Sequence, residues 1–494
     1  MTEVELKFQV PPDARNALRD AVMARQPTRI HLRARYFDRA DGTLARSGIS
    51  LRLRLEDGVW VQTLKAPARG AADRQEHEVQ LDTAASAEPD LDIARHAGTE
   101  AGARLLSALG SEKATGLQES HRTDVVRHAL LLRTRHGIVE LALDTGHIEA
   151  AGRSRPVHEI EFELKRGSPA DVVTAALPWV RRHGLWLDAV SKGERGHLLA
   201  QGRAHADAAR AASPKTVPEA PEALAREVVT ACLGQILRNA SEVAGGSGDP
   251  DHVHQLRVGL RRLRTALQEL APLDACLDPE WEAPLVDAFR ELGRHRDQTL
   301  LDTGTGKALV DAGAPRVKQA AAATPAVDPA AVVKAWPLQD TLLALLAYTL
   351  TPPGPVATAF EGDAIDAIST RLDALQRKLR KSAKRFTTMS VDDQHSVRKR
   401  LKRLRYLSEF IAPAFRNAKV SDFFDHLKPA QDALGEHNDE ASALVHFQSR
   451  TSDDPHAWFA VGWLTARQAR SAEKAAKVLQ AAGRAEPFWQ GKRR

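Results

Sequence analysis

The first two hundred residues are dominated by short segments in which apolar and polar residues alternate. In residues 1–8 the alternation is unbroken. Because successive side chains of a strand point to opposite faces, Glu3, Glu5 and Lys7 would share one face, with apolar residues on the other. Similar segments recur, and we expect strands at residues 30–38, 49–55, 59–65, 74–79, 122–135, 139–144 and 158–165.

Helices and turns are expected between these strands. The dipeptide Asp57-Gly58 lies between two alternating segments and predicts a hairpin turn. We interpret Asp144-Thr145-Gly146 as another turn. Helical segments are expected near residues 12–25, 101–109 and 169–183. This part of the chain is therefore expected to be an antiparallel sheet with flanking helices.

The charged faces of the expected strands are rich in arginine and glutamate. Arg52 and Arg54 share one such face, and Glu159, Glu161 and Glu163 share another. A sheet closed into a barrel would turn these faces inward and form a polar tunnel. Arginine and lysine would bind a linear polyanion there, and the carboxylates could hold a divalent cation. The alternative is an open sheet whose charged face is solvated.

Beyond residue 222 the apolar residues recur with the period of an α-helix. The residues just before are rich in alanine and proline, and we expect a short helix there followed by a linker. Two later stretches, 304–329 and 351–362, are expected to be loops. The expected organisation is an N-terminal domain, a linker and an all-helical domain with two half-units, at residues 1–201, 202–221, 222–494, about 222–345 and about 360–494.

Two sets of basic residues in the helical part are related by a constant offset. The sets are His254, Arg257, Arg261 and Arg264, and His395, Arg398, Lys402 and Arg405, each member of the second lying 141 residues after its counterpart. Steps of three, four and three residues place each set along one stripe of a helix. Like charges along a stripe repel one another, and the repetition favours an anion-binding site over a solvated face. It also predicts an internal duplication.

Composition narrows the class of protein. The chain has 494 residues, two cysteines and a formal net charge of +6. So few cysteines argue against a disulfide scaffold and suggest a reducing compartment. The sequence has no apolar run of about 18 residues and no secretion-signal pattern at its start, so we expect a cytoplasmic protein without a membrane partner. Nucleic acid is not an expected partner, because aromatic residues are not interleaved with the basic stripes.

The opening segment Glu3-Val4-Glu5-Leu6-Lys7 resembles the E-x-E-x-K signature of CYTH domains, the triphosphate tunnel metalloenzymes. Further motifs resemble the family in the same order, over about residues 1–200: Tyr36-Phe37-Asp38, Leu51 to Arg54, Thr63-Leu64-Lys65, Arg74 to Glu78, Glu140 to Asp144, Glu159 to Glu163, and Ser191-Lys192 with Arg195. The resemblance implies an eight-stranded antiparallel tunnel. It also implies hydrolysis of inorganic or thiamine triphosphate, or cyclisation of ATP, with Mg²⁺ or Mn²⁺.

The same resemblance implies roles for individual residues. The implied metal ligands are Glu3, Glu5, Asp144, Glu161 and Glu163, with Glu159 contributing or balancing charge. The implied substrate-binding residues are Lys7, Arg52, Arg54, Lys65, Arg127 and Lys192, with Arg122 and Arg133 as alternatives to Arg127. The implied catalytic set is Glu3, Glu5, Lys7, Glu161 and Glu163. No protein nucleophile is implied, and a metal-positioned water would attack the terminal phosphoryl group.

The helical part resembles the CHAD domain. The resemblance rests on H-x-x-R-x-x-x-[RK]-R-L-R, which begins at His254 and again at His395, and on L-G-x-x-x-D in each half, at Leu292 to Asp297 and Leu434 to Asp439. It covers roughly residues 222–494. It implies two pseudo-symmetric helical bundles and binding of inorganic polyphosphate by the two basic stripes.

Together the two resemblances predict a metal-dependent inorganic triphosphatase whose helical domain binds polyphosphate. One alternative is a non-catalytic polyphosphate-binding protein that is targeted to polyphosphate granules. Another is a thiamine triphosphatase or nucleotide cyclase, which would need an aromatic wall, and Trp60 and Trp186 are the nearby aromatic candidates. The expected location is the cytoplasm, with association with polyphosphate granules as a further expectation.

Overall fold

The computed structural model describes most of the chain. The described residues are 4–67, 74–110, 116–303, 305–315, 327–352 and 362–493, without the side chains of residues 74, 295–303, 305 and 306. Two compact units can be separated. Unit 1 comprises Met1–Arg210, Leu233–Leu256 and Ala330–Pro352, and unit 2 comprises Ala211–Cys232, Arg257–Pro329 and Pro353–Arg494.

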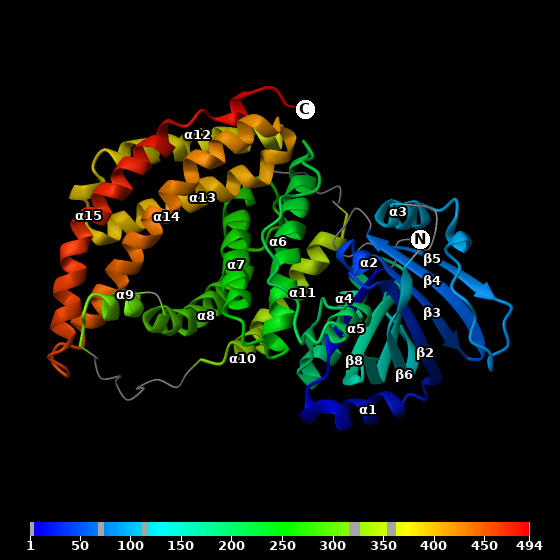
Figure 1. Ribbon diagram of the computed structural model, residues 1–494. Helices are drawn as coiled ribbons and strands as arrows, with labels where there is room; N and C mark the ends of the chain where they lie inside the picture. Colours follow the sequence, from blue (N-terminus) through cyan, green and yellow to red (C-terminus); the bar gives the residue numbers. More distant parts are fainter. Residues whose placement is uncertain are drawn as a thin grey trace. The chain divides into compact units, whose positions relative to one another are not determined.

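Unit 1 is built around one antiparallel sheet (Figure 1). Its strands are ordered β5-β4-β3-β2-β6-β7-β8-β1-β9. Their bounds are Glu5–Gln9 (β1), Thr28–Arg39 (β2), Ser50–Glu56 (β3), Val59–Pro67 (β4), Arg74–Leu81 (β5), Leu117–Arg133 (β6), Ile138–Ala150 (β7), Arg153–Arg166 (β8) and Trp186–Leu187 (β9). The two-residue β9, which pairs with β1, is additional to the eight strands expected. The described residues form no ladder between β5 and β9.

Helices lie on both faces of this sheet. Those of the N-terminal part are Arg15–Met23 (α1), Thr43–Arg46 (α2), Glu100–Leu109 (α3), Ala170–His183 (α4) and Lys192–Ala200 (α5). The apolar face packs under α2 and α3, where Leu51, Leu64 and Leu105 are buried in one cluster. Helix α5 lies on the charged face, because Lys192 in its first turn contacts Glu161 of β8. The expected antiparallel sheet with flanking helices is therefore confirmed.

The alternation of side chains in the strands follows the sequence pattern. In β1 and β3, each apolar residue is buried and each polar residue between them is partly exposed. The prediction of a turn at residues 144–146 is wrong, because β7 continues to Ala150. Gly146 stands opposite Val125, and a Cβ atom added to it would lie 2.0 Å from the backbone oxygen of Asp124. This glycine thus permits close approach of two strands rather than a turn.

The segment that joins the sheet to the helical part contains no helix at residues 203–220, so the short helix expected there is also wrong. Instead, side chains of later helices form hydrogen bonds with the backbone of its first residues. The Asn239 side chain accepts from the Ala209 amide at 3.0 Å and donates to the Ala209 oxygen at 2.9 Å. The His252 ring lies 3.0 Å from the Ala206 oxygen. This part of the connection is therefore attached along its length within unit 1.

The described residues after 220 are mostly helical. The helices are Pro221–Ala244 (α6), Pro250–Leu270 (α7), Glu282–Thr303 (α8), Thr305–Asp311 (α9), Pro329–Lys334 (α10), Trp336–Leu350 (α11), Ala364–Ala383 (α12), Val391–Ile411 (α13), Asn417–Gln448 (α14) and Ala457–Arg484 (α15). Helix α9 lies in the first stretch expected to be a loop, so that prediction is wrong there, and most of the second stretch, 351–362, lies outside the described residues. The C-terminal all-helical fold is confirmed, and among the described residues no helix is long and apolar enough to cross a membrane.

Two side-chain contacts in unit 2 relate α7 to α13 in a reciprocal way. Arg262 of α7 lies 3.4 Å from a carboxylate oxygen of Glu409 in α13. Arg403 of α13 donates to Gln268 of α7, also at 3.4 Å. Arg403 lies 141 residues after Arg262, and Glu409 lies 141 residues after Gln268. Such exchanged contacts are what a two-fold relation between duplicated halves produces.

Candidate active site on the charged face of the sheet

The charged face of the unit 1 sheet is largely shielded from solvent. The side chains of Lys7, Lys192 and Arg127 are 9%, 15% and 18% exposed. Solvated charges on an open sheet would be far more exposed, since lysine and arginine are rarely buried unless they are paired. The structure therefore favours an enclosed polar face over the alternative of a solvated one.

Three carboxylates converge on this face from neighbouring strands. Asp144 on β7 stands opposite Glu159 on β8, and Glu161 lies two residues further along β8. One oxygen atom from each of the three residues lies within 4.8 Å of the others. An all-oxygen set of this kind fits a hard divalent cation such as Mg²⁺ or Mn²⁺. We call Asp144, Glu159 and Glu161 the acidic trio.

Lys192 and Arg127 make the closest contacts with the acidic trio. The Lys192 ammonium lies 2.8 Å from Asp144 and 2.7 Å from Glu161, and it also contacts Glu159. The Arg127 guanidinium donates from Nε to Asp144 at 2.8 Å, from Nη2 to the other Asp144 oxygen at 2.7 Å, and also to Glu161. Arg122, Arg127 and Arg133 were alternatives for one substrate-binding residue, and Arg127 is thus the one that contacts the trio.

These contacts fix the protonation states in the site. Burial alone would raise the pKa of Glu161, but the charges of Lys192 and Arg127 outweigh it and hold that pKa well below its ordinary value. Burial would likewise lower the pKa values of Lys192 and Arg127, but the neighbouring carboxylates raise both well above their ordinary values. All three groups are therefore charged at neutral pH.

Lys7 lies at the edge of the same cluster. Its ammonium lies 3.5 Å from Glu159 and 3.2 Å from Asp188, and it also donates to the backbone oxygen of Val190. The Gln9 amide donates to the same two carboxylates, at 3.1 Å to Glu159 and 2.7 Å to Asp188. Lys7 is therefore held by two buried acids at one end of the acidic trio.

Strands β3 and β4 supply a second group of cations. Lys65 lies 3.0 Å from Glu76, and Arg54 lies 3.5 Å from Glu78. Arg52 donates to the hydroxyl of Tyr36, which stands opposite it on β2, at 3.3 Å. Burial alone would raise the pKa of Tyr36, but the charge and hydrogen bond of Arg52 outweigh it and lower that pKa. We call Arg52, Arg54 and Lys65 the basic wall.

Three of the expected metal ligands lie outside the acidic trio. Glu3 falls outside the described residues. Glu5 stands opposite Glu163 in the ladder between β1 and β8, two residues before Lys7 on β1 and two residues after Glu161 on β8. Glu163 contacts Lys165 at 2.8 Å. Glu5 and Glu163 therefore form an acidic pair beside the trio.

The sequence analysis missed several residues of the site. Asp188 and Gln9 were not singled out, and Tyr36 was quoted without a role. A signal existed for Gln9, which continues the alternating face of Glu5 and Lys7. Asp188 follows the two-residue β9, where no periodic pattern exists, and its contact with Lys7 spans 181 residues. Nothing in the local sequence indicates such a contact.

The two candidate aromatic residues lie in different surroundings. Trp60 packs with Leu53 and Leu55, on the face of the sheet opposite to the basic wall. The Trp186 ring is covered by the Lys334 ammonium, 4.3 Å from the ring centroid. Trp60 is therefore not available as an aromatic wall against the acidic trio, whereas Trp186 stands opposite Gln9 in the ladder between β9 and β1.

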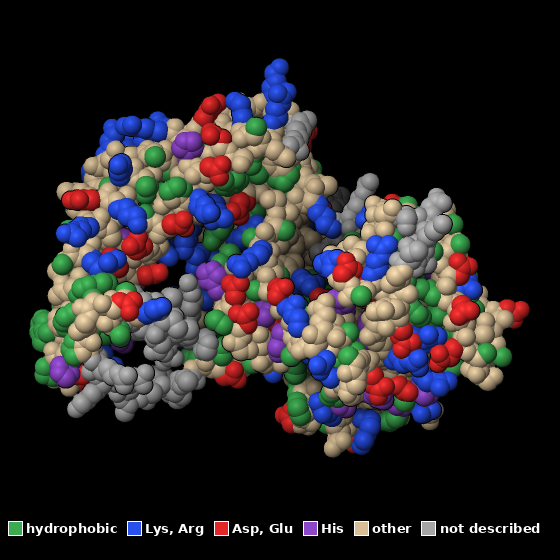
Figure 2. Space-filling model, viewed as in Figure 1, with side chains coloured by type: hydrophobic (Ala, Val, Ile, Leu, Met, Phe, Trp, Pro, Cys, Tyr) green, Lys and Arg blue, Asp and Glu red, His purple; other side chains and the backbone are tan. Residues whose placement is uncertain are grey.

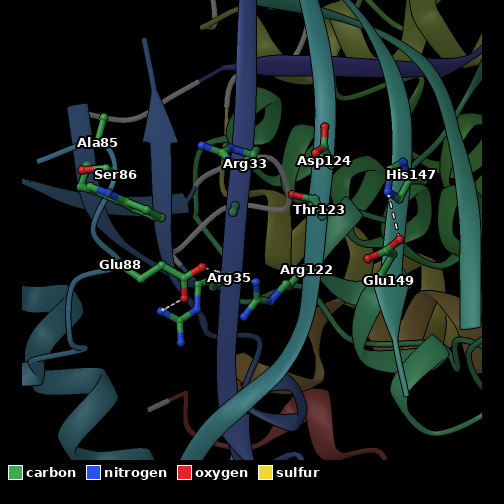
Figure 3. Close-up of a pocket in the computed structure, with 12 residues that line it drawn as sticks. Arg33, Arg35, Ala85, Ser86, Glu88, Arg122, Thr123, Asp124, His147 and Glu149 are labelled. Carbon is green, nitrogen blue, oxygen red and sulfur yellow. Dashed lines mark hydrogen bonds and ion pairs between the residues drawn. The ribbon is translucent and has the colours of Figure 1, made fainter. Parts of the chain in front are cut away.

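A separate cavity of about 410 Å³ lies on the face of the sheet opposite to the charged face (Figure 3). Its lining includes Arg33, Arg35, Arg122, Glu88, Asp124 and Glu149. Figure 3 shows the Arg35 and Glu88 side chains in contact, at 3.1 Å. Arg122 lies 3.5 Å from the same glutamate. Three carboxylates thus balance the three arginines of this cavity.

The basic stripes lie on two helices of the helical part. Helix α7 carries the first set and α13 carries the second. The guanidinium carbons of Arg257 and Arg261 lie 4.8 and 5.0 Å from the ring centroid of Phe289, and Arg264 lies 3.0 Å from Glu282. Phe289 thus holds two arginines by cation–π contacts. Figure 2 shows Lys and Arg side chains around the hollow of the helical part.

The second stripe is held mainly by polar contacts. The His395 ring lies 2.7 Å from the side-chain oxygen of Asn438. Arg405 lies 2.6 Å from Glu409 and also donates to Gln431. In both stripes the last arginine is paired with a glutamate, Glu282 in the first and Glu409 in the second. The two stripes are therefore similar in layout but differ in the side chains that support them.

The chain resembles known proteins in both of its parts. It is 29% identical over 209 residues to an inorganic triphosphatase from Haemophilus influenzae, a match that spans 40% of this chain and 55% of that relative. The solved CHAD domain from Ricinus communis is 26% identical, with a TM-score of 0.46, and the match covers 59% of this chain and 98% of that one.

A solved adenylyl cyclase homologue from Hippeastrum, described as having a dominant triphosphatase activity, is 20% identical with a TM-score of 0.29. That match covers 41% of this chain and 97% of the other. Family models match in two places: residues 1–195 match the CYTH domain, and residues 227–448 match the CHAD domain. The chain thus combines an N-terminal CYTH domain with a C-terminal CHAD domain.

Proposed function

We propose that the chain is a divalent-metal-dependent inorganic triphosphatase. The observation that carries this proposal is the acidic trio, which lies on the same shielded face as Lys7, Arg127, Lys192 and the basic wall. A face with both charges suits a phosphate chain bound together with a cation, because a simple anion site gains nothing from buried carboxylates. The similarity to an inorganic triphosphatase supports the same reaction.

The acidic trio is the proposed metal site. Asp144, Glu159 and Glu161 would hold the ion, and Glu5 with Glu163 offers further oxygen ligands beside them. Glu3 remains a proposed ligand from the sequence. When bound, Mg²⁺ or Mn²⁺ would withdraw charge from the phosphoryl oxygens and orient water.

The cations of this face are proposed to bind the phosphate chain. Phosphate oxygens would replace carboxylate oxygens as the partners of the lysines and arginines, with arginine able to bind two oxygens at once. Such fixed cations stabilise the charge that develops on the equatorial oxygens during phosphoryl transfer. The proposed substrate-binding residues are Lys7, Arg52, Arg54, Lys65, Arg127 and Lys192. Water is the proposed nucleophile, and carboxylates of this face are proposed to assist proton removal.

A substrate panel tests this function. Phosphate release from inorganic triphosphate would be measured with and without Mg²⁺ or Mn²⁺, in parallel with ATP, thiamine triphosphate and long-chain polyphosphate. We expect metal-dependent release mainly from inorganic triphosphate, because Trp60 does not face the acidic trio and the Trp186 ring is covered by Lys334. Release mainly from thiamine triphosphate, or cyclic nucleotide formation from ATP, would refute the substrate assignment. Absence of phosphate release from every substrate would refute the proposed activity and favour the alternative of a non-catalytic polyphosphate-binding protein.

We further propose that the CHAD domain binds inorganic polyphosphate through the stripes on α7 and α13. The cation–π contacts of Phe289 support this proposal, because they hold Arg257 and Arg261 side by side on one face of α7. Cytoplasmic location and association with polyphosphate granules follow as proposals. Domain limits at residues 1–201 and 222–494, with a linker between them, are also proposals.

A further inference from the structure

The segment Leu187–Val190, which we call the strap, begins at the last residue of β9, and its Asp188 side chain reaches the charged face. The Asp188 carboxylate is buried. Its Oδ2 atom accepts from Lys7 at 3.2 Å and from Gln9 at 2.7 Å, and it also contacts Arg195 of α5. One carboxylate therefore connects a lysine on β1 with an arginine on α5.

The strap is also tied to β1 through its backbone. The Asp188 amide donates to the Lys7 oxygen at 2.9 Å, and the Lys7 ammonium donates to the Val190 oxygen. The other Asp188 oxygen accepts from the Val190 amide at 2.9 Å. Burial alone would raise the pKa of Asp188, but the charges of Lys7 and Arg195 outweigh it and lower that pKa, so the carboxylate stays ionised.

The two amides that flank Asp188 are bonded by residues far along the chain. The Leu187 amide donates to the side-chain oxygen of Gln339 in α11 at 2.9 Å. The Ala189 amide donates to the hydroxyl of Ser241 in α6 at 2.8 Å. Both partners belong to unit 1, although they lie within the residues that match the CHAD domain.

Both partners are themselves fixed. The Gln339 side chain is buried, and its amide nitrogen donates to the Val333 oxygen at 2.8 Å. The buried Ser241 hydroxyl donates to the Leu237 oxygen at 2.7 Å. One turn earlier in α6, Arg238 contacts Glu194, which lies two residues after Lys192. Helix α6 thus reaches both the strap and the helix that carries Lys192.

We propose that Asp188 is a positioning residue that aligns Lys7 and Arg195 for triphosphate, and that Ser241 and Gln339 hold the strap in place for it. This inference rests on the proposed function of the charged face. It makes α6 and α11, which the sequence assigns to the CHAD domain, part of the structure that shapes the triphosphate site. Isolated residues 1–201 would then lack the support of their own substrate-binding face.

The substitution Ser241→Ala, in the full-length chain, tests this inference with little loss of volume. The variant removes the acceptor for the Ala189 amide. Thr341→Ala is the matched control, because Thr341 is a buried hydroxyl in unit 1 whose hydrogen bond goes to Pro337 in its own helix. Asp188→Asn tests the carboxylate itself. The measurements are hydrogen exchange of the strap amides, and binding of a non-hydrolysable imidotriphosphate by calorimetry in the presence of Mn²⁺.

We expect Ser241→Ala to speed exchange at Ala189 and to weaken imidotriphosphate binding by about tenfold, as loss of one buried hydrogen bond implies. Asp188→Asn should weaken binding at least as much, and Thr341→Ala should change neither quantity. Faster exchange at Ala189 with unchanged binding would overturn the positioning role. If the unsubstituted chain does not bind imidotriphosphate at all, the proposed function fails, and the role of the strap in it fails too.

Discussion

At the scale of single residues, the charged face is governed by buried charges that depend on one another. Asp144 is fully buried, and both Lys192 and Arg127 contact it. A buried ion pair contributes little net stability, yet removing one partner is costly because a buried charge is left without compensation. The acidic trio should therefore tolerate loss of Lys192 only if another cation replaces it.

Lys192→Ala should lower the free energy of unfolding by about 3 kcal/mol in metal-free buffer, because the acidic trio loses its ammonium. A saturating concentration of Mn²⁺ should restore much of that loss, and it should stabilise the variant more than the unsubstituted chain. Thermal unfolding with and without Mn²⁺ measures both effects. Equal shifts of the midpoint in the two proteins would contradict the assignment of the trio as a metal site.

His121 makes stability depend on pH. It is buried and stacks on Tyr36 with 4.4 Å between ring centroids, and burial lowers its pKa to about 3, with a smaller contribution from the charge of His197. The unfolded chain binds a proton at this position below about pH 6.5, and the folded chain does not. Stability should therefore be lost as the pH falls from 6.5 towards 3, by about 1.4 kcal/mol per pH unit from this group.

Urea unfolding between pH 6.5 and 4.5 checks this dependence. The variant His121→Phe keeps an aromatic ring against Tyr36 but cannot take up a proton. We expect its free energy of unfolding to fall less steeply with pH than that of the unsubstituted chain. Parallel pH dependences in the two proteins would show that His121 is not the group responsible.

At the scale of elements, the ladder between β6 and β7 places Asp144 against Arg127. Its register relies on Gly146, the residue that the sequence analysis assigned to a turn. A one-residue slip would turn every side chain of a strand to the other face. The glycine therefore contributes to the site although its own atoms do not line it.

Gly146→Ala should destabilise the chain by about 1 to 3 kcal/mol, because the added Cβ atom would overlap the Asp124 backbone oxygen. Gly234→Ala is the control, since nothing lies within 4 Å of the added atom and alanine is the better helix former. That control should be neutral or stabilising. Urea unfolding compares them, and equal stability of the two variants would contradict the close approach at Gly146.

The sequence predicted elements well where a periodic pattern existed. The alternating faces of β1 and β3 lie as expected, because one buried face imposes period two on a strand. The Asp-Thr-Gly turn was wrong because glycine serves both turns and close strand contacts. The contact of Ser241 with Ala189 was not predictable, since it is set by packing between segments 52 residues apart and has no pattern.

At the scale of the whole molecule, one chain is proposed to carry two anion-binding surfaces. Acids and bases are mixed on the charged face of the sheet, which suits a short phosphate chain with a metal. The stripes on α7 and α13 are basic, which suits a longer phosphate chain bound through charge. Because the surfaces use different residues, their ligands should be separable by mutation.

Arg257→Ala combined with Arg398→Ala should weaken binding of long-chain polyphosphate and make that binding less dependent on salt. Triphosphate hydrolysis should be unchanged. The control removes two exposed arginines elsewhere, Arg377 and Arg470, with the same change in net charge. Fluorescence anisotropy with labelled polyphosphate, at several salt concentrations, measures the effect. Equal affinity of the two double variants for polyphosphate would contradict the proposal that the stripes bind it.

Metal-dependent triphosphate hydrolysis at the acidic trio is tested most directly by the initial rate of phosphate release from inorganic triphosphate as Mn²⁺ is titrated. It would be measured for the unsubstituted chain, for Glu161→Gln and for Glu149→Gln, an exposed glutamate on the opposite face of the sheet. We predict metal-dependent release by the unsubstituted chain and by Glu149→Gln, and at least a hundredfold loss for Glu161→Gln, of the order seen when an essential charged group is removed. Full activity of Glu161→Gln, or release that does not depend on Mn²⁺, would contradict the account.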